Sequence, residues 1–532
     1  MIRKGTPSLL VPILLALAFV LPFQGTRPLW GTDEGRYSAV AVEMLESGDW
    51  LLPHRHPDHP HVSKPPIIYW AMASSMAVFG KNEWALRLPS ALAFVLTIGC
   101  VFTIGKRLQP ERPWWPAVVV AGTTLTFLAA NAASIDPLLS AFETLGMTGV
   151  ILAWRGESYR IGRCGAWITG LGFGLAFLTK GLPGLVPLIP ALWFYWRNRS
   201  DFRANPFNWK MLAVSVPIGL SWFIAVIALY PEMHLLRYFL GYETYGRIFT
   251  DIQNRNPQWY GWIVAFGPVA VVGALPWTLL VMWDAFRRRA QPKSPMSDSD
   301  RAVSRFLLLW LFVPLAVFCI ARSRLTLYVL PLLVPFALWA AHRTRDLALT
   351  RNGKLLLALW FALLVGAKAC LGYVDFGKDA SALADNIRAQ VLPRIHEIVF
   401  VDEAALYGLR VYLDIPVLRV NYDDSVDPAV DMSLGSALAQ KRPRRLWLVH
   451  MQTVDRFTKD VATTGGHARQ VVTYANYRGF LIDSVSPRAI PLNAKPEHHR
   501  YQLASSPKPN NNDVRQLKLP KPDAKPSALR SR

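Results

Sequence analysis

The stretch WGTDEGRYSAVAVEML, residues 30–45, follows an apolar run at residues 8–24 and opens with two adjacent carboxylates, Asp33 and Glu34. The apolar run has about the length needed to cross a bilayer, which is roughly 17–25 residues. It is preceded by basic residues and lacks a small-residue cleavage site, so we expect an uncleaved membrane anchor rather than a signal peptide. The chain therefore presents charged groups directly after leaving the membrane.

A helix that starts at Asp33 would carry Asp33, Arg36 and Tyr37 on one face, because residues three and four apart are neighbours on a helix. Apolar residues on its other side predict that it lies along the membrane interface. A structural role explains these charges as well. Acids in a first turn suit the helix dipole, and Asp33 can pair with Arg36. Spacing alone leaves both interpretations open.

The rest of the 532-residue chain repeats the pattern of the first run. About half of it is apolar, and its 20 tryptophans tend to lie near the ends of the apolar runs, as in interfacial belts. We expect an α-helical polytopic membrane protein with about eleven or more spans and further interfacial helices. The predicted spans are 8–24, 84–105, 113–131, 136–154, 165–179, 182–196, 211–230, 259–285, 306–321, 325–341 and 355–374.

The net charge of +22 is mainly a matter of topology. With a cytoplasmic N-terminus, every second connection falls on the cytoplasmic side and is rich in Lys and Arg, as the positive-inside rule requires. This distribution argues against nucleic acid as a partner. It predicts a multi-pass protein of the inner (plasma) membrane.

Three regions follow from composition. Residues 1–374 form the membrane domain. Residues 375–485 alternate short β-branched runs with helical stretches and predict a small soluble α/β domain, which an odd number of spans places in the periplasm. Residues 486–532 are basic, rich in Pro and Asn, and predicted to be disordered. The four cysteines show no paired spacing, so neither disulfides nor a thiolate metal site is indicated.

Basic and phenolic groups gather on the same side as Asp33. Lys64 precedes Pro65-Pro66, where a second interfacial helix would begin. Further candidates lie at the outer ends of later spans or in the second long outer connection: Asp136, Arg237, Glu243, Arg247, Arg255, Arg322, Arg324 and Tyr328. Cations that hold a phosphate, with a carboxylate nearby for proton chemistry, are what a reaction on a lipid phosphate needs.

These residues carry a resemblance to a known family. The pattern TDEGRY…SGDW…KPPIIYW…NEWALRLPSAL, with ASIDPLLSAFETLGM, FLTKGLPGLVPLIPALW and SRLTLYVLPLLVPFAL, resembles the lipid A aminoarabinose transferases and protein O-mannosyltransferases. These are glycosyltransferases of the GT-C superfamily that use polyprenyl-phosphate sugars. The resemblance covers residues 1 to about 345.

The resemblance implies transfer of a sugar from a polyprenyl phosphate on the periplasmic side, with inversion at the anomeric carbon. It implies catalytic roles for Asp33 and Glu34. It implies donor or acceptor contacts for Arg36, Tyr37, Lys64, Arg247 and Tyr328, and the positions of Asp136 and Arg324 at the outer ends of spans add them as candidate substrate contacts. Lipid A or another envelope glycan is the first expected acceptor, and a protein hydroxyl the second. No cofactor is expected.

Two positions depart from the aminoarabinose transferases. An acid usually precedes Lys-Pro-Pro, where this chain has Ser63, and a His in the second outer connection is replaced near Thr244. Because those positions supply a metal site in that family, no metal is carried over. One alternative stays open: the segment PHRHPDHPHVSK, with four histidines and Asp58, has ligands that suit zinc or copper.

Two other classes of protein remain to be separated from an enzyme. A flippase for a lipid-linked sugar would typically show repeated halves with charge at the midplane, whereas here no repeat is visible and the charge lies at one face. A lipid-binding protein without activity would need Asp33 only for structure.

Overall fold

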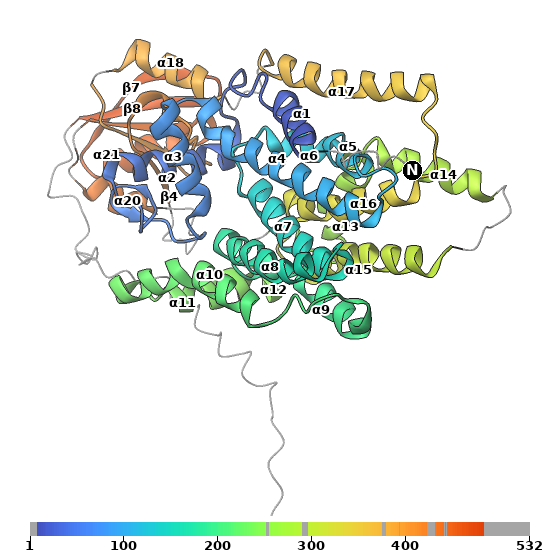
Figure 1. Ribbon diagram of the computed structural model, residues 1–532. Helices are drawn as coiled ribbons and strands as arrows, with labels where there is room; N and C mark the ends of the chain where they lie inside the picture. Colours follow the sequence, from blue (N-terminus) through green and yellow to red (C-terminus); the bar gives the residue numbers. More distant parts are fainter. Residues whose placement is uncertain are drawn as a thin grey trace, which may run out of the picture.

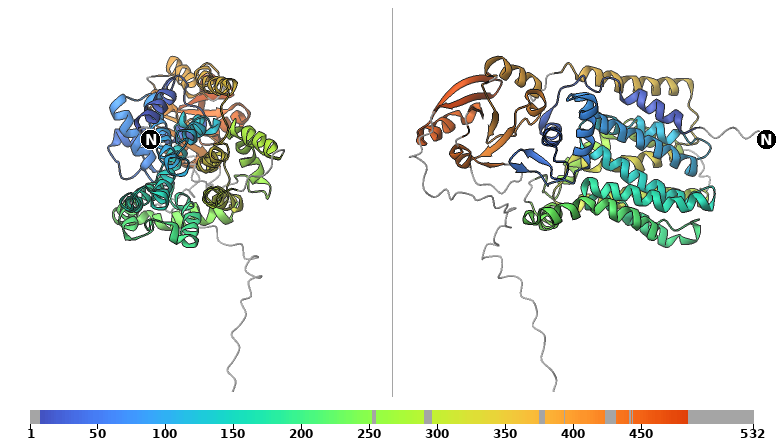
Figure 2. Two further views of the ribbon diagram at one scale, coloured as in Figure 1. Left: turned by 45° about the vertical axis from the view of Figure 1, so that its right-hand side comes forward. Right: turned by 60° about the vertical axis from the view of Figure 1, so that its left-hand side comes forward.

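A bundle of apolar helices and a β-sheet domain occupy opposite ends of the computed structural model (Figure 1). The structure describes residues 8–251, 255–289, 296–374, 379–392, 394–422, 431–440, 442 and 444–483. In the right-hand view of Figure 2 the long helices of the bundle run side by side, and the sheet lies beyond one of their ends. The expected domain boundary after residue 374 and the expected tail at 486–532 lie outside the described residues.

Seven helices among the described residues are long and apolar enough to cross a membrane, or eight if one bent pair counts as a span. The seven are α4 (Glu83–Leu108), α7 (Ile135–Arg155), α8 (Tyr159–Lys180), α10 (Trp209–Leu229), α15 (Asp298–Ile320), the run Thr326–Arg343 that ends in α16 (Leu333–Arg343), and α17 (Arg351–Leu371). The bent pair joins α13 (Gly261–Pro268) to α14 (Trp277–Arg289) at an angle of 75°.

The remaining predicted spans are shorter helices, so the expected count of eleven does not follow from helix length. They correspond to α1 (Leu10–Val20), to α5 (Trp115–Ala121) with α6 (Thr124–Ala130), and to α9 (Leu188–Arg197). The break between α5 and α6 has a local cause. Thr123 is extended, and the backbone N–H of Thr124 bonds the carbonyl of Leu275, 3.1 Å away. A bond outside the helix thus replaces one inside it.

Helices α7 and α8 approach each other closely because glycines face one another. A Cβ added at Gly172 would lie 2.1 Å from the backbone nitrogen of Gly146, and one at Gly149 would lie 2.4 Å from that of Thr169. Small residues allow such backbone contact between membrane helices. This packing fixes the relative position of α7 and α8, which carry Asp136 and Lys180.

Two helices and a hairpin lie between the bundle and the sheet domain. They are α2 (Gly31–Ser47), the strands β1 (His54–His56) and β2 (His59–Pro60), and α3 (Ile67–Phe79). Helix α2 begins at Gly31, two residues before the expected start, and the φ of +64° at Gly31 favours glycine. Its apolar residues Val40 and Met44 are buried in a cluster with residues of α3.

Helix α2 is enclosed by protein on two sides. Its opposite side packs closely against the C-terminal region. A Cβ added at Gly35 would lie only 2.5 Å from the backbone nitrogen of Gly408. The expected position of α2 along the membrane interface stays a prediction, but its apolar side packs against protein. Its pattern of small and apolar residues reflects two protein neighbours.

The C-terminal region contains a six-stranded sheet in the order β5-β4-β3-β6-β8-β7. The strands are β3 (Glu397–Val401), β4 (Val417–Asn421), β5 (Met432–Ser433), β6 (Arg445–His450), β7 (His467–Tyr474) and β8 (Tyr477–Asp483). Strands β3 to β6 pair in parallel, and β8 pairs antiparallel with both β6 and β7.

Both faces of this sheet are covered. Alternate residues of β3 enter different apolar clusters: Ile398 and Phe400 pack with residues of α18 (Ala380–Gln390) and α19 (Leu409–Leu413). Val399 and Val401 pack with residues of α20 (Leu434–Ala439) and α21 (Val454–Thr463). Burial on both faces explains the near-continuous apolar run of this strand.

Candidate active site

Helix α2 presents Asp33, Arg36 and Tyr37 at the end of the bundle that faces the sheet domain. The Asp33 side chain is 65% exposed, and one of its oxygens lies 3.8 Å from the Arg36 guanidinium. This is a loose pair, so the Asp33 carboxylate remains accessible to other groups. Burial, together with the negative charges of Asp33 and Asp136, raises the pKa of Tyr37 well above its usual range. Tyr37 therefore stays a hydrogen-bond donor.

Glu34 points away from Asp33 into a buried ionic network. Its two oxygens accept hydrogen bonds from Arg27, at 2.8 Å each, and from Arg87, at 3.1 and 3.2 Å. The backbone N–H groups of Trp30 and Ala133 also donate to them. Burial opposes ionisation of Glu34, but the charges of Arg87 and Arg27 outweigh it and lower its pKa to about 2.

This network gives Glu34 a structural task. It ties the start of α2 to α4 and to the segment before α7, three elements that are far apart in sequence. A permanently ionised carboxylate with all its acceptor sites occupied is poorly suited to accept a proton. These contacts favour a positioning role for Glu34 over the expected catalytic role and leave Asp33 as the accessible acid; the catalytic expectation itself stays a prediction.

Lys64 lies in a second ionic cluster. Its ammonium group donates to Glu243 at 2.8 Å and to the carbonyl of Ser63 at 2.9 Å. The same oxygen of Glu243 pairs with Arg247 at 2.7 Å. Burial and the charge of Arg247 lower the pKa of Lys64 to about 8, although Glu243 opposes this shift. Lys64 is thus a buried cation paired with a single carboxylate, that of Glu243, which also pairs with Arg247.

Glu243 and Arg247 are positioned by an unusual turn of backbone. A π-helix covers Tyr238–Gly246 and continues directly into α12 (Arg247–Phe249), after the short helix α11 (Leu235–Arg237). π-Helical turns are frequent at functional sites. Burial alone would raise the pKa of Glu243, but the cations Lys64 and Arg247 lower it to about 2.

Tyr328 contacts Arg247, Arg255 and Lys180. Its hydroxyl oxygen accepts from Arg247 at 2.8 Å and from Arg255 at 3.2 Å. The ammonium of Lys180 lies 4.5 Å from the centre of its ring, a cation–π geometry. Lys180 in turn pairs with Asp136. The contacts therefore run without a gap from Lys64 through Tyr328 to Asp136.

The group around Asp33 and the cluster around Tyr328 influence each other electrostatically. The charge of Asp136 helps to raise the pKa of Tyr37, and the charges of Arg36 and Lys64 help to lower the pKa of His61, which precedes Lys64 by three residues. Seven of the nine predicted site residues lie in one or other of these two groups: Asp33, Arg36, Tyr37, Lys64, Asp136, Arg247 and Tyr328.

Arg324 is held by backbone carbonyl groups. Its guanidinium donates to the backbone carbonyls of Asn256, Gln258 and Cys319 at 2.7 to 3.0 Å. It is 5% exposed and holds the segment after Arg255 against the start of the following span. These contacts favour a supporting role for Arg324, while the expected contact with the substrate stays a prediction.

The histidine hairpin contacts protein partners. His56 lies 2.9 Å from Glu397 of the sheet domain, His61 lies 2.9 Å from Ser63, and His54 lies 2.8 Å from the carbonyl of Leu52. Within the described ranges, no three His, Cys, Asp or Glu side chains are grouped so that they could hold a metal ion. Ser63 and Thr244 offer only hydroxyls, so the residues do not fit the metal site of the resembling family.

Sequence reasoning missed the importance of Lys180 and of the Arg27–Arg87 pair. Lys180 ends the apolar stretch FLTK just before Gly181, and a lone cation at the end of a span was the available signal. Nothing in the sequence joins Arg27 and Arg87 to Glu34, because these partners are separated by 7 and 53 residues.

Comparisons with known proteins identify a matching family and several relatives. Residues 63–229 match the family described as dolichyl-phosphate-mannose-protein mannosyltransferase. The undecaprenyl phosphate-alpha-4-amino-4-deoxy-L-arabinose arabinosyl transferase of Pseudomonas paraeruginosa is 32% identical over 71% of this chain and 67% of its own length. A relative of the same name, numbered 2, from Pseudomonas fluorescens is 31% identical over 69% of this chain and 66% of its own. The matched region thus spans about two thirds of these relatives.

Solved structures extend the similarity in fold to most of the chain. The crystal structure of ArnT from Cupriavidus metallidurans bound to undecaprenyl phosphate has a TM-score of 0.69 at 20% identity, covering 91% of this chain and 99% of that one. The apo form of the same protein has a TM-score of 0.66 and 19% identity. The helical bundle and the C-terminal region together therefore resemble one known architecture.

Proposed function

Because the chain belongs to the family of the undecaprenyl phosphate-alpha-4-amino-4-deoxy-L-arabinose arabinosyl transferases, which are membrane glycosyltransferases, we propose that it moves a sugar from a polyprenyl phosphate to an acceptor in the cell envelope. The names of the relatives and the undecaprenyl phosphate in the related crystal structure support this donor.

The cation cluster is the observation that carries this proposal. Four cations, Lys64, Lys180, Arg247 and Arg255, lie around Tyr328 and are joined to two carboxylates, Glu243 and Asp136. The cluster therefore has an excess of two positive charges. A sugar-linked lipid phosphate is a diester with one negative charge, and the released lipid phosphate is a monoester with up to two. The excess charge favours the leaving group as it forms.

The reaction proposed is an in-line displacement. An acceptor oxygen attacks the anomeric carbon, the bond from that carbon to the phosphate oxygen breaks, and the lipid phosphate leaves on the opposite side with inversion. Asp33 orients the acceptor oxygen and takes its proton where that oxygen is a hydroxyl. Lys64 and Arg247 neutralise the charge that develops on the phosphate. Arg36 and Tyr37 hold the sugar or the acceptor between Asp33 and the cluster.

Lipid A or another envelope glycan is the first acceptor to test, because the most similar relatives named above are aminoarabinose transferases. A protein hydroxyl is the second candidate, since residues 63–229 match a protein mannosyltransferase family. Mass spectrometry of lipids, glycans and proteins from the envelope of a deletion strain identifies the product that is lost, and thereby the acceptor and the sugar.

The topology proposed has a cytoplasmic N-terminus in the inner membrane, with Asp33, Lys64 and the sheet domain on the periplasmic side. The eight candidate spans, with α1, the α5–α6 pair and α9 with its preceding turn, make eleven crossings. An odd number puts the sheet domain opposite the N-terminus. The basic connections, such as Lys106–Arg112 and Arg155–Arg163, then lie in the cytoplasm.

Reconstitution tests the activity itself. The purified chain in vesicles with a radiolabelled polyprenyl-phosphate sugar and an envelope-lipid extract is expected to yield a labelled acceptor and unlabelled lipid phosphate. Movement of the intact labelled lipid across the bilayer, without transfer of its sugar, would identify a flippase instead.

A further inference from the structure

Aromatic and cationic side chains alternate along α8 at the end of the bundle opposite to the candidate active site. Tyr159, Arg163 and Trp167 are each four residues apart, so they lie on one face of the helix. The Arg163 guanidinium lies 5.8 Å from the centre of the Tyr159 ring. Tyr159 begins α8, whereas Lys180 of the cation cluster ends it. A helix of this length spans roughly 30 Å, so the stripe is separate from the candidate active site.

Helix α10 places a second cation and a further tryptophan beside this stripe. It lies next to α8 (Figure 1), where a Cβ added at Gly170 would lie 2.5 Å from the carbonyl oxygen of Met211. The rings of Trp167 and Trp209 are 6.2 Å apart, edge to face. The ammonium group of Lys210 lies 5.9 Å from the centre of each of these two rings, within the range of cation–π contacts. Together, Tyr159, Arg163, Trp167, Trp209 and Lys210 form what we call the α8–α10 surface.

Neither cation of the α8–α10 surface has a carboxylate partner. The side chains of Arg163 and Lys210 form no ion pair with any residue that the structure describes. The acids nearest to them in sequence, Glu157 and Asp201, interact with arginines outside this surface. The surface therefore carries two positive charges that the described protein does not neutralise.

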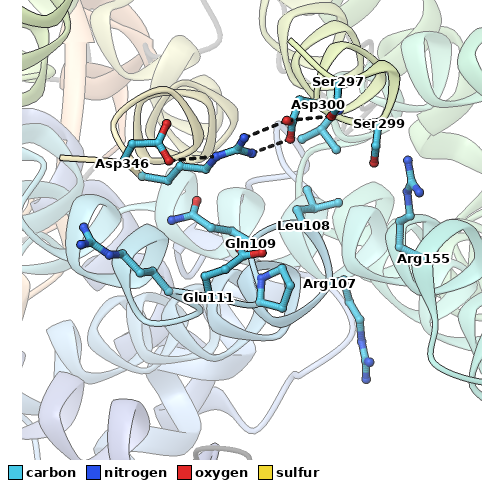
Figure 3. Close-up of a pocket in the computed structure, with 13 residues that line it drawn as sticks. Arg107, Leu108, Gln109, Glu111, Arg155, Ser297, Ser299, Asp300 and Asp346 are labelled. Atoms are coloured by element: carbon cyan, nitrogen blue, oxygen red, sulfur yellow. Dashed lines mark hydrogen bonds and ion pairs between the residues drawn. The ribbon is translucent and has the colours of Figure 1, made fainter. Parts of the chain in front are cut away.

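The polar cavity at the same end of the bundle differs in this respect (Figure 3). Side chains of α4, α7 and α15 help to line it, and its four arginines are balanced by carboxylates in or beside it. Arg345 pairs with Asp300 and Asp346, and Arg107 pairs with Glu157. The unpaired cations at this end therefore lie on the outside of the bundle and not in its cavity.

Exposed apolar side chains continue both helices toward the middle of the bundle. Leu171 follows Trp167 by four residues, and Leu212 and Val216 follow Trp209 by three and seven, so each set stays on one face of its helix. All five side chains are exposed, Trp209 by 67% and Leu212 by 55%. In a membrane protein, exposed apolar side chains face acyl chains and tryptophans favour the level of the head groups. The order of cation, aromatic ring and apolar side chain thus matches a phospholipid from head group to tail.

We propose that the α8–α10 surface binds one anionic phospholipid in the leaflet at this end of the bundle. Lys210 is the direct partner of the head-group phosphate, and Arg163, one helical turn beyond Trp167, adds a second positive charge. The acyl chains lie along the apolar residues of α8 and α10. An anionic lipid is favoured over a zwitterionic one, because a choline group would bring a further positive charge to two unpaired cations. The site does not depend on sugar transfer, because none of its residues belongs to the candidate active site.

Two measurements on the purified, delipidated full-length chain test this proposal. Titration with phosphatidylglycerol or phosphatidylcholine, followed by native mass spectrometry, counts the bound lipids and gives their affinities. A photoactivatable phosphatidylglycerol, mapped by peptide mass spectrometry, locates the lipid on the chain.

The test variants are the double substitution Arg163→Gln with Lys210→Gln, each of its single substitutions, and Lys210→Arg, which keeps the charge. The matched control is Arg351→Gln with Lys354→Gln. These are an exposed arginine and an exposed lysine at the start of α17, and neither lies over an aromatic ring among the described residues.

The expected result is one tightly bound phosphatidylglycerol per chain, with label on residues 159–171 and 209–220. Each cation near a membrane surface contributes about fivefold to the affinity, so the double variant should bind at least tenfold more weakly and each single Gln variant about fivefold more weakly. Lys210→Arg and the control should bind like the wild type.

The location of the label tests the proposal on the wild type alone, even where the double variant does not fold. The proposal is overturned if the label falls elsewhere, if phosphatidylcholine binds as tightly, or if inorganic phosphate displaces the lipid at equal concentration. Wild-type affinity in a folded double variant, or an equal loss in the control, also overturns it.

Discussion

At the scale of single residues, adjacent carboxylates in one motif have opposite environments. Asp33 is exposed and loosely paired, whereas Glu34 is buried and bonded to two arginines. Neighbouring positions on a helix point in different directions, and these environments favour an accessible acid at Asp33 and a structural role for Glu34.

The Glu34 network yields the first prediction. Glu34→Gln leaves Arg27 and Arg87 buried without a counter-charge, which costs about 3–5 kcal/mol of stability. Thermal unfolding in detergent should show a clearly lowered midpoint, while Glu232→Gln, an exposed control, should unfold like the wild type. If Glu34→Gln keeps the wild-type midpoint but loses turnover, Glu34 is a catalytic group and the positioning role is wrong.

Lys64 yields a prediction on pH. Its pKa is lowered to about 8, so its charge is present below this pH and is lost as the pH rises through it. Because kcat/KM reports the free enzyme, kcat/KM for the donor should fall above about pH 8. Lys64→Arg, which stays charged, should move this limb to higher pH. A limb at the same pH in both proteins would assign it to another group.

The proximity of Lys64, Arg247 and Tyr328 is predictable from sequence, because each lies at the outer end of a span or in an outer connection. The carboxylate that joins two of them is harder to identify. Glu243 is one of several charged residues in its segment, and only the π-helical turn aims it at both Lys64 and Arg247. Side-chain direction in an irregular turn has no periodic signal.

At the scale of elements, the hairpin β1–β2 links the active site to the sheet domain. Arg55 pairs with Asp431, His56 with Glu397, and Asp58 with Arg442. Lys64 follows the hairpin by only four residues. The polar composition of this segment, which suggested a metal site, instead matches a charged protein surface.

This docking yields a third prediction. Asp431→Asn removes the charge that pairs with buried Arg55, so the hairpin should separate more often from the sheet domain. Hydrogen exchange at residues 54–60 should become at least tenfold faster, with a higher KM for the donor. Asp483→Asn breaks an exposed ion pair with Arg469 in the same domain and should change neither value. Unchanged exchange in Asp431→Asn would mean that the other contacts suffice for docking.

Helix number shows where sequence prediction of elements stops. The apolar runs at 8–24, 113–131 and 182–196 are helical only in part, since hydropathy records composition and not backbone bonding. At Thr124 a backbone hydrogen bond to the carbonyl of Leu275 interrupts the helix, and no pattern in residues 113–131 predicts this interruption. By contrast α4 and α17 match their predicted spans closely, because each is a continuous apolar helix with basic residues at its ends.

At the scale of the whole molecule, charge is divided between two ends. The end with Asp33 holds the cation cluster inside the protein, and the other end holds the basic connections, which the positive-inside rule predicts to be cytoplasmic. The chain's similarity to ArnT in fold covers both the bundle and the sheet region.

This division yields a prediction on topology. A green fluorescent protein fused after residue 485 should be dark when exported through the general secretory route, because it folds poorly outside the cytoplasm. Alkaline phosphatase fused at the same position should be active. A fluorescent fusion with inactive phosphatase would reverse the placement of the sheet domain and of the proposed active site.

The role of Asp33 is the central claim. Asp33→Asn keeps size and hydrogen bonding but removes charge and basicity. A structural Asp33 would contribute only about 0.3–1 kcal/mol through the helix dipole. A base should lose on the order of 10²–10⁴-fold in rate. Asp385→Asn is the matched control, since Asp385 also pairs with an arginine three residues on, in α18.

The decisive measurement is the rate of sugar transfer from a labelled polyprenyl-phosphate donor in vesicles that contain wild-type, Asp33→Asn or Asp385→Asn protein at equal folded amounts. We expect Asp33→Asn to retain less than about a hundredth of wild-type turnover with donor binding preserved, and Asp385→Asn to match the wild type. Turnover by Asp33→Asn above about a tenth of the wild-type rate would contradict a base at this position and leave Asp33 only its place in the first turn of α2.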